Sequence, residues 1–151
     1  SLPDADRSRL KAALGLTDAQ VLRAAQLDNG PVWQVLELRS AADVLAIDAD
    51  RVRWPEFVAL GVVGAYPPSE DADYAVRNLA PSSGMSEDPI TGSLNAAIAQ
   101  WMHAEGRLAH DLVMSQGTMI GRDGQVFVSQ RGNQIMIGGN VQILIEGTVA
   151  L

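Results

Sequence analysis

The segment Thr91–Ala104 constrains the fold more than any other, because it predicts a helix that is apolar around its whole circumference. Within Ser93–His103 the only polar residues between the two ends are Asn95 and Gln100. A helix on a protein surface normally carries a polar face, whereas a helix that is apolar on all sides is buried. The rest of the chain must therefore cover this helix.

Most of the remaining chain predicts short strands. Apolar runs bounded by Gly, Pro, Asn or Asp are typical of strands. Such runs lie at Val21–Asp28, Val32–Leu38, Val58–Ala65, Tyr74–Leu79, Leu112–Gln116, Gln125–Val128, Gln134–Ile137, Val141–Ile145 and Thr148–Leu151. Many strands around one buried helix indicate an α+β fold: a curved, β-barrel-like sheet, mixed or antiparallel, wrapped around a central apolar helix.

Other helical patterns are short. Asp4–Leu14 has acidic residues in its first turn and stops before Gly15, both of which are typical of a helix. Ala41–Ile47 and Arg51–Leu60 predict short helical or irregular stretches. No internal repeat or long linker divides the sequence, so we expect residues 1–151 to form a single domain.

Composition excludes several classes of function. The chain has 151 residues, no cysteine and a formal charge of −7. Without cysteine there are no disulfides, thiolate metal sites or cysteine nucleophiles. The negative charge repels phosphate backbones, and no apolar run approaches the roughly 20 residues of a membrane span, so neither nucleic acid nor a membrane is an expected partner. No export signal is visible, which favours the cytoplasm, and a first residue Ser1 suggests a processed chain or a piece of a longer one.

The segment 84–93 is the strongest candidate for a site. Thr91 or Ser93 is expected to cap the apolar helix, and Gly92 would let a ligand approach the backbone closely. The free N–H groups of the first helical turn would then form an anion pocket. Asp88, fixed by Pro89, would lie beside it and could accept a hydrogen bond from a substrate. The alternative is that Asp88 and Thr91 only cap the helix.

Other polar and aromatic residues give weaker signals. His103 and His110 are seven residues apart, which is not a metal-ligand spacing, so no metal is expected. Arg77 would either steer an acidic substrate or pair with Glu87 or Asp88. Core or interface positions are expected for the three tryptophans, Trp33, Trp54 and Trp101.

The same region resembles a known family. Arg77-Asn78-Leu79-Ala80-Pro81, then Gly84, then Glu87-Asp88-Pro89-Ile90-Thr91-Gly92-Ser93 is similar to the signature of the PhzF-like isomerases of phenazine biosynthesis. Gly15 and the turn 28–31 upstream fit the same family, as do several glycine-containing pairs downstream: Gln116-Gly117, Gly121-Arg122, Gly138-Gly139 and Glu146-Gly147. The resemblance covers nearly the whole chain, but only the C-terminal half of such a protein.

The resemblance implies a diaminopimelate-epimerase-like fold, with two halves that each wrap a barrel around a helix and an active site between them. It implies an isomerase that needs no metal or cofactor and moves a proton between carbons. Asp88 would hydrogen-bond the substrate or shuttle the proton, and Ser93 with the Gly92 amide would hold a carboxylate. Gly84 and Thr91 would also line the substrate site. The general acid/base glutamate belongs to the N-terminal half, and Glu87 does not replace it.

This sequence departs from the family signature at three positions. Leu79 stands where an aromatic residue is usual, and Leu94-Asn95 replaces an Ala-His pair. Leu94 could narrow the pocket and Asn95 changes its polar lining. The identity of the substrate is therefore not determined by the resemblance. The lack of cysteine separates the chain from thiol-dependent racemases of the same fold.

Two functions follow from these observations. The first is an isomerase domain that acts on a small carboxylate-bearing metabolite together with its N-terminal half, with a homodimer as the expected assembly. The alternative is a non-catalytic module for anion binding or dimerisation on the same fold, and a motif inherited without any present activity also stays open.

Overall fold

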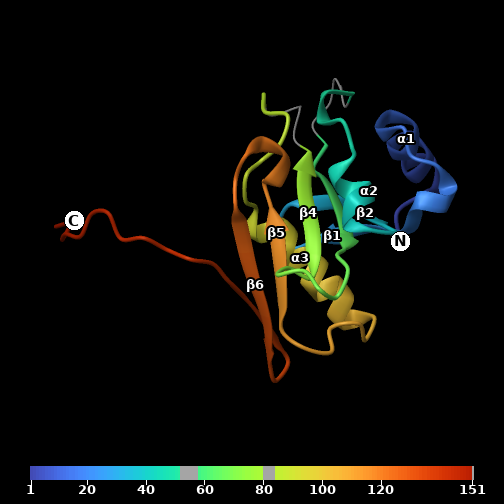
Figure 1. Ribbon diagram of the computed structural model, residues 1–151. Helices are drawn as coiled ribbons and strands as arrows, with labels where there is room; N and C mark the ends of the chain where they lie inside the picture. The colour runs from blue at the N-terminus through green and yellow to red at the C-terminus, as the bar shows by residue number, and fades with distance from the viewer. Residues whose placement is uncertain (52–57, 80–83, 151) are drawn as a thin grey trace.

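One curled mixed sheet organises the molecule (Figure 1). The computed structural model describes residues 1–51, 58–79 and 84–150. Its seven strands lie in the order of the sequence: β1 (Val21–Asp28), β2 (Val32–Leu38), β3 (Leu60–Ala65), β4 (Tyr74–Leu79), β5 (Leu112–Gln116), β6 (Gly124–Arg131) and β7 (Gln134–Gly138). The β2–β3 and β4–β5 pairs are parallel and the other neighbours are antiparallel. The prediction of a curved mixed sheet is therefore confirmed.

Three α-helices accompany the sheet in the described part of the chain, and they lie in predicted helical segments. They are α1 (Asp4–Leu14), α2 (Ala41–Leu45) and α3 (Gly92–Ala104), with 3-10 turns η1 (Asp18–Gln20), η2 (Ala49–Arg51) and η4 (Thr118–Ile120). Gly15 ends α1 in the left-handed conformation, with φ 68°. Residues 52–57 of the predicted stretch Arg51–Leu60, Trp54 among them, lie outside the described residues.

The sheet separates two apolar cores. In β3, Leu60 and Val62 belong to the core shared with α1 and α2, whereas Val63 belongs to the core shared with α3. Successive strand residues point to opposite faces, so a strand covered on both sides must be apolar throughout. This explains why the sequence of β3 is almost continuously apolar and why five of its six residues are buried.

The apolar helix α3 packs on one face of the sheet. Its side chains Leu94, Ile98 and Met102 have no exposed surface. It contacts strands at both ends of the strand order, namely β1, β2, β6 and β7. The sheet must therefore curl for strands so far apart in its order to reach one helix.

The last two predicted strands do not form. Residues 139–150 contain no helix or strand and extend away from the body (Figure 1). The predictions at Val141–Ile145 and Thr148–Leu151 were therefore wrong up to residue 150, and Leu151 lies outside the described residues. The apolar alternation is present, but a strand also needs a neighbour for its backbone groups, and this segment pairs with no described strand.

No helix in the described part of the chain combines the length and the apolar character needed to cross a membrane.

A substitution at a glycine in β3 can test how tightly α2 packs on the sheet. A Cβ atom at Gly64 would lie 2.4 Å from the carbonyl oxygen of Ser40, the residue that caps α2. Because this neighbour is backbone, Gly64→Ala should lower the free energy of unfolding by about 1–3 kcal/mol. The control is Gly138→Ala, where the nearest atom lies 4.0 Å away. Equal urea midpoints for the two variants would contradict the described packing.

Candidate active site

The candidate site lies at one end of the sheet, where several strands begin or end. The pairing pattern places the starts of β2, β3 and β6 beside the ends of β4 and β5. Asp88 forms an isolated antiparallel bridge with Asn78 near the end of β4, and its N–H donates to the Asn78 carbonyl oxygen at 3.1 Å. The turn that leads into α3 is therefore attached to the sheet at this end.

The Thr91 hydroxyl is the centre of a hydrogen-bond network at the start of α3. It donates to a carboxylate oxygen of Asp88. It accepts from the side-chain amides of Asn78 and Gln116, each at 3.0 Å. Thr91 occupies the N-cap position, but its side chain accepts no hydrogen bond from the helix. The expectation of side-chain capping was therefore wrong, because the hydroxyl oxygen accepts from the Asn78 and Gln116 amides instead of from a helix N–H.

Gln116, at the end of β5, connects the strand to both the turn and the helix. Its side chain is 1% exposed. Its Nε2 donates to the Asp88 carbonyl oxygen at 3.0 Å, and its Oε1 accepts from the Thr91 N–H at 3.1 Å. The same Oε1 accepts from the Asn95 amide at 2.8 Å, and that amide also donates to the Thr91 carbonyl at 2.9 Å. One buried side chain thus fixes the turn and the first turn of α3 together.

The remaining amides at the start of α3 are available for a ligand. In the described part of the chain neither the N–H groups of Gly92 and Ser93 nor the Ser93 hydroxyl have a hydrogen-bond partner. A Cβ built on Gly92 would meet nothing within 4 Å, so the approach to these amides is open. The Ser93 carbonyl accepts from the side-chain amide of Asn29 at 2.7 Å, which anchors this turn to the β1–β2 connection. A helix N-terminus with unpaired N–H groups favours an anion.

Two glycines let the loop before α3 pack closely on the sheet. A Cβ at Gly117 would lie 2.7 Å from the Pro89 carbonyl oxygen, and one at Gly124 would lie 2.9 Å from the same oxygen. Gly117 also has φ +88°, which other residues rarely adopt. Pro89 is thereby held against β5 and β6, and Asp88 with it.

Arg77 forms a buried ion pair with Glu87. The Arg77 guanidinium nitrogens lie 2.7 and 3.0 Å from one Glu87 carboxylate oxygen. Arg77 also donates to the carbonyl oxygens of Val44 and Ile47, at 3.1 and 2.6 Å, which ties α2 to the site loop. Arg77 is 3% exposed. Of the roles considered for it, the structure supports pairing with Glu87, and its burial leaves it unable to steer a substrate.

The other sequence-predicted residues occupy different positions. Gly84 is exposed, with φ +82°, and a Cβ built on it would meet nothing within 4 Å. Leu94 does not line the open approach to the helix end: it is fully buried, and its Cδ1 would lie 2.4 Å from a Cβ on Gly61. The suggestion that Leu94 narrows the pocket is therefore wrong. Asn95 is buried within the Gln116 network.

The histidines and the acidic residues form no metal centre in the described ranges, since no group of three or more His, Asp or Glu side chains is placed to hold an ion. His103 lies in the last turn of α3, at the opposite end of the helix from Asp88.

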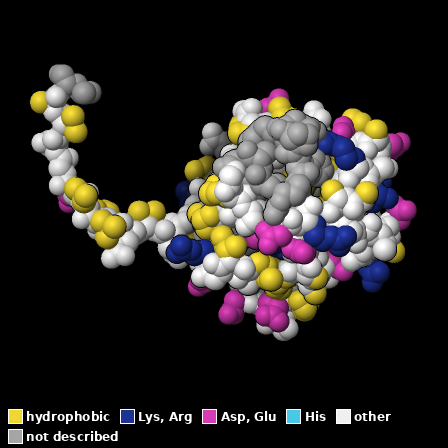
Figure 2. All heavy atoms as spheres, turned by 90° about the horizontal axis from the view of Figure 1, so that it is seen from above, with side chains coloured by type: hydrophobic (Ala, Val, Ile, Leu, Met, Phe, Trp, Pro, Cys, Tyr) yellow, Lys and Arg dark blue, Asp and Glu magenta, His cyan; other side chains and the backbone are white. Residues whose placement is uncertain are grey.

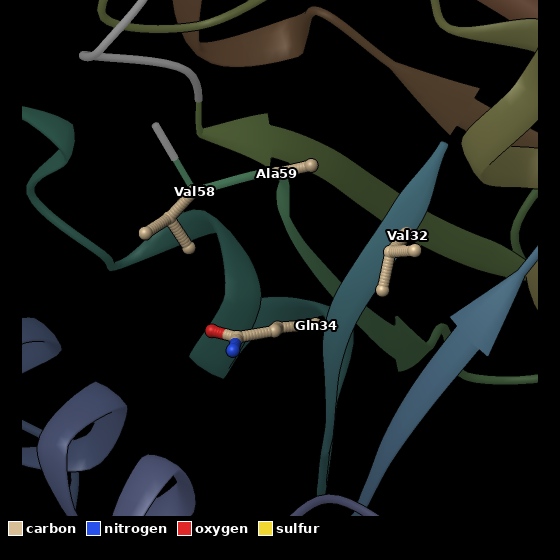
Figure 3. A pocket seen from close by; sticks show the side chains of 4 residues that line it. All are labelled: Val32, Gln34, Val58 and Ala59. Atoms are coloured by element: carbon tan, nitrogen blue, oxygen red, sulfur yellow. The ribbon is translucent and has the colours of Figure 1, made fainter. Parts of the chain in front are cut away.

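A cavity of about 380 Å³ opens at the same end of the sheet (Figure 3). It is lined by Val32 and Gln34 of β2 and by Val58 and Ala59, which precede β3. Among the described residues, the buried Oε1 of Gln34 has no hydrogen-bond partner. The described lining of the cavity is apolar apart from Gln34, and it lies close to the β1–β2 connection that carries Asn29.

Sequence reasoning missed the polar residues that hold the site. Asn78 and Gln116 stand near the ends of mostly apolar strands, and Asn29 stands in a turn. A buried polar side chain needs partners, so an amide at the end of an apolar strand is a signal of a network. That signal was present at Asn78 and Gln116, but it does not identify the partners.

The Thr91 network can be tested with one substitution. Thr91→Val keeps the shape but removes the hydroxyl, which leaves the Asn78 and Gln116 amides short of an acceptor. The free energy of unfolding should fall by about 1–3 kcal/mol. Thr91→Ser keeps the hydroxyl and should cost clearly less. Urea denaturation followed by circular dichroism measures both, and equal losses would contradict the network.

The buried ion pair gives a second test. Glu87→Gln leaves the buried Arg77 charge uncompensated, so it should destabilise the protein by about 3–5 kcal/mol. The control is Glu105→Gln, which removes one of the two carboxylate partners of Arg107, in a pair in which the Glu105 side chain is 40% exposed. An exposed pair contributes less than about 1 kcal/mol. Similar shifts in the urea midpoints of both variants would argue against a structural role for Arg77–Glu87.

Comparisons with known proteins give one consistent result. Residues 1–147 match the PhzC-PhzF family, described as phenazine biosynthesis-like protein. An uncharacterized isomerase of Deinococcus radiodurans is 34% identical over 155 residues, which cover 91% of this chain and 50% of that protein. The uncharacterized isomerase YfhB of Bacillus subtilis is 29% identical over 154 residues, or 95% of this chain and 51% of that protein.

Solved structures show the same fold. A phenazine biosynthesis protein of the PhzF family from Enterococcus faecalis superposes with a TM-score of 0.65 at 21% identity, over 100% of this chain and 52% of that one. The chain therefore spans about half the length of the curated relatives and of the structure that it matches.

Proposed function

The chain belongs to the PhzC-PhzF family of phenazine biosynthesis-like proteins, and from that premise we propose that it is the C-terminal half of a cofactor-independent isomerase. The reaction transfers a proton between two carbons of a small carboxylate-bearing metabolite. The isomerase names of the relatives support the reaction class. The observation that carries the proposal is the open start of α3, where unpaired amides lie close to the Asp88 carboxylate.

The N-terminus of α3 binds the substrate carboxylate. The amides of Gly92 and Ser93 donate to its oxygens, the Ser93 hydroxyl adds a third donor, and the helix dipole favours the negative charge. The chain carries a formal charge of −7, so an acidic metabolite must be held by such local donors. Thr91 shapes this end of the helix through its bond to Asp88.

Asp88 orients the rest of the substrate. One of its carboxylate oxygens accepts from the Thr91 hydroxyl. The other accepts from a substrate amino or hydroxyl group, so that Asp88 positions the reacting carbons or relays the proton between them. Because the turn is fixed by Gln116 and Asn78, Asp88 is preorganised before the substrate arrives.

The proton-transferring group comes from the N-terminal half of the longer protein. A general base removes the proton from one carbon and the resulting acid returns it to the other, so no redox partner is needed. The length of the relatives, about twice that of this chain, supports a second half. The proposal also includes a barrel closed around α3, a homodimeric assembly and a cytoplasmic location.

Carboxylate binding can be tested on this chain alone. Titration with 2-aminobenzoate should shift the amide resonances of Gly92 and Ser93 in two-dimensional nuclear magnetic resonance spectra. The matched control ligand is 2-aminobenzamide, which has the same ring but no negative charge and should leave those amides unchanged. Ser93→Ala should weaken binding about tenfold, the effect of losing one hydrogen bond to a charged group. Equal responses to both ligands would contradict a carboxylate site.

Turnover is tested in the longer protein. If its gene encodes no upstream half, the two-half proposal fails. Otherwise Asp88→Asn should reduce deuterium uptake from ²H₂O into candidate 2-amino and 2-hydroxy acids by at least about 100-fold, the usual contribution of a positioned acid or base. Unchanged exchange would remove Asp88 from the reaction. Carboxylate binding without any exchange in the unsubstituted protein would favour the non-catalytic anion-binding module.

A further inference from the structure

Asn95 is a polar residue in the buried part of an apolar helix. The other buried residues of α3 are all apolar, and Asn95 is 0% exposed. It contributes nothing to the surface at this end of the sheet, which Figure 2 shows from above. In the described part of the chain its Oδ1 has no hydrogen-bond partner. A buried acceptor without a donor costs free energy that an apolar side chain would avoid, so packing does not explain Asn95.

The acceptors that Asn95 contacts do not depend on its side chain. The Asn95 Nδ2 donates to the Thr91 carbonyl oxygen at 2.9 Å and to the Gln116 Oε1 at 2.8 Å. The same carbonyl oxygen also accepts from the Asn95 backbone N–H at 3.2 Å, and the same Oε1 also accepts from the Thr91 N–H at 3.1 Å. Removing the side-chain amide would therefore leave neither acceptor without a donor. It would remove a constraint on the direction of the Gln116 amide.

The direction of the Gln116 amide follows from the Thr91 backbone through Asn95. A carbonyl oxygen can only accept, so Asn95 presents its Nδ2 to Thr91. That nitrogen can only donate, so the atom of Gln116 that faces it is Oε1. The Gln116 Nε2 then lies on the other side, where it donates to the Asp88 carbonyl oxygen and to the Thr91 hydroxyl, each at 3.0 Å.

This direction determines the partner of the Thr91 hydroxyl proton. A hydroxyl has one hydrogen to donate, and it rotates to suit its neighbours. Because the Gln116 Nε2 donates to it, the hydroxyl accepts from Gln116 and donates to Asp88. If the Gln116 amide were turned over, its Oε1 would face the hydroxyl and could take the proton. The Asp88 carboxylate would then lose the bond that orients it.

We propose that Asn95 is a positioning residue of the candidate site. It fixes the Gln116 amide, which keeps the Thr91 proton on Asp88 and leaves the other Asp88 oxygen directed at the ligand. Asn95 itself touches no ligand, because it lies behind the hydrogen-bond network. Only the last step, the contact between Asp88 and a ligand donor, rests on the proposed function.

Ligand preference tests the proposal. Asn95→Leu keeps the branching of the side chain and removes its polar atoms. Benzoate and 2-aminobenzoate share the ring and the carboxylate, but only 2-aminobenzoate has an amino group for Asp88. The unsubstituted chain should bind 2-aminobenzoate at least about tenfold more tightly, as expected for one hydrogen bond to a charged group. In Asn95→Leu this preference should fall below about threefold, because only a fraction of the molecules then holds Asp88 correctly.

Ile98→Val is the matched control. Ile98 lies in the same helix and is 0% exposed, but it belongs to the apolar core. This substitution should lower the urea midpoint and leave the ligand preference unchanged. Asn95→Leu should show the reverse, with a urea midpoint that does not fall, because it removes an unpartnered acceptor and creates none. A residue with a purely structural role would give the pattern of Ile98→Val.

The ligand-free chain gives a direct measurement of the Gln116 amide. Both Nε2 hydrogens are used in hydrogen bonds, so they should exchange slowly with solvent in nuclear magnetic resonance spectra. Asn95→Leu should accelerate this exchange at least about tenfold, the effect of losing roughly one hydrogen bond, and Ile98→Val should not.

The remaining outcomes overturn the proposal or separate it from the proposed function. A ligand preference that Asn95→Leu retains, or a Gln116 exchange rate that it leaves unchanged, would mean that Asn95 does not position the site. If neither benzoate nor 2-aminobenzoate binds the unsubstituted chain, the proposed carboxylate site fails. The exchange of the Gln116 amide then decides alone whether Asn95 fixes its direction.

Discussion

The side-chain amide of Gln116 is the interaction on which the rest of the candidate site depends. It is buried at the end of β5, and it holds both the backbone of Asp88 and the first turn of α3. A primary amide can donate and accept at the same time, so one residue satisfies the N–H of Thr91 and the carbonyl of Asp88. The Thr91 N–H is thus used for structure, and the next two amides of the helix are left for a ligand.

Different contacts hold the candidate site on the two faces of the sheet. On one face, the Arg77–Glu87 pair ties α2 to the loop that precedes Asp88. On the other face, α3 is fixed by apolar packing along its length, and polar contacts hold its start to the β1–β2 connection and to β5. Apolar packing holds the helix in place, but it does not determine which polar groups the helix presents. The polar contacts at its start determine which groups point outward, and this combination can preorganise a binding site.

The sequence predicted those features that depend on local pattern. The segment that forms α3 was recognisable because apolar residues surround the helix axis. The segment that forms β3 was recognisable from its continuous apolar run, which reflects a strand covered on both faces. Contacts between distant residues were not predictable in the same way. Thr91 meets Gln116, 25 residues later, only because β4 and β5 pair in parallel register. The Thr91 hydroxyl oxygen then accepts from the Asn78 and Gln116 amides instead of capping the helix. After Gly139 the apolar alternation predicted strands that do not form up to residue 150, because such a pattern does not supply a neighbouring strand.

A structure of the chain crystallised with 2-aminobenzoate tests the central claim most directly, namely that Gln116 and Thr91 present the start of α3 as a carboxylate site. The account predicts carboxylate oxygens within hydrogen-bond distance of the amide nitrogens of Gly92 and Ser93, with the bonds between Thr91 and Gln116 retained. A carboxylate bound elsewhere, or a Thr91 N–H that has left Gln116 to bind the ligand, would contradict it.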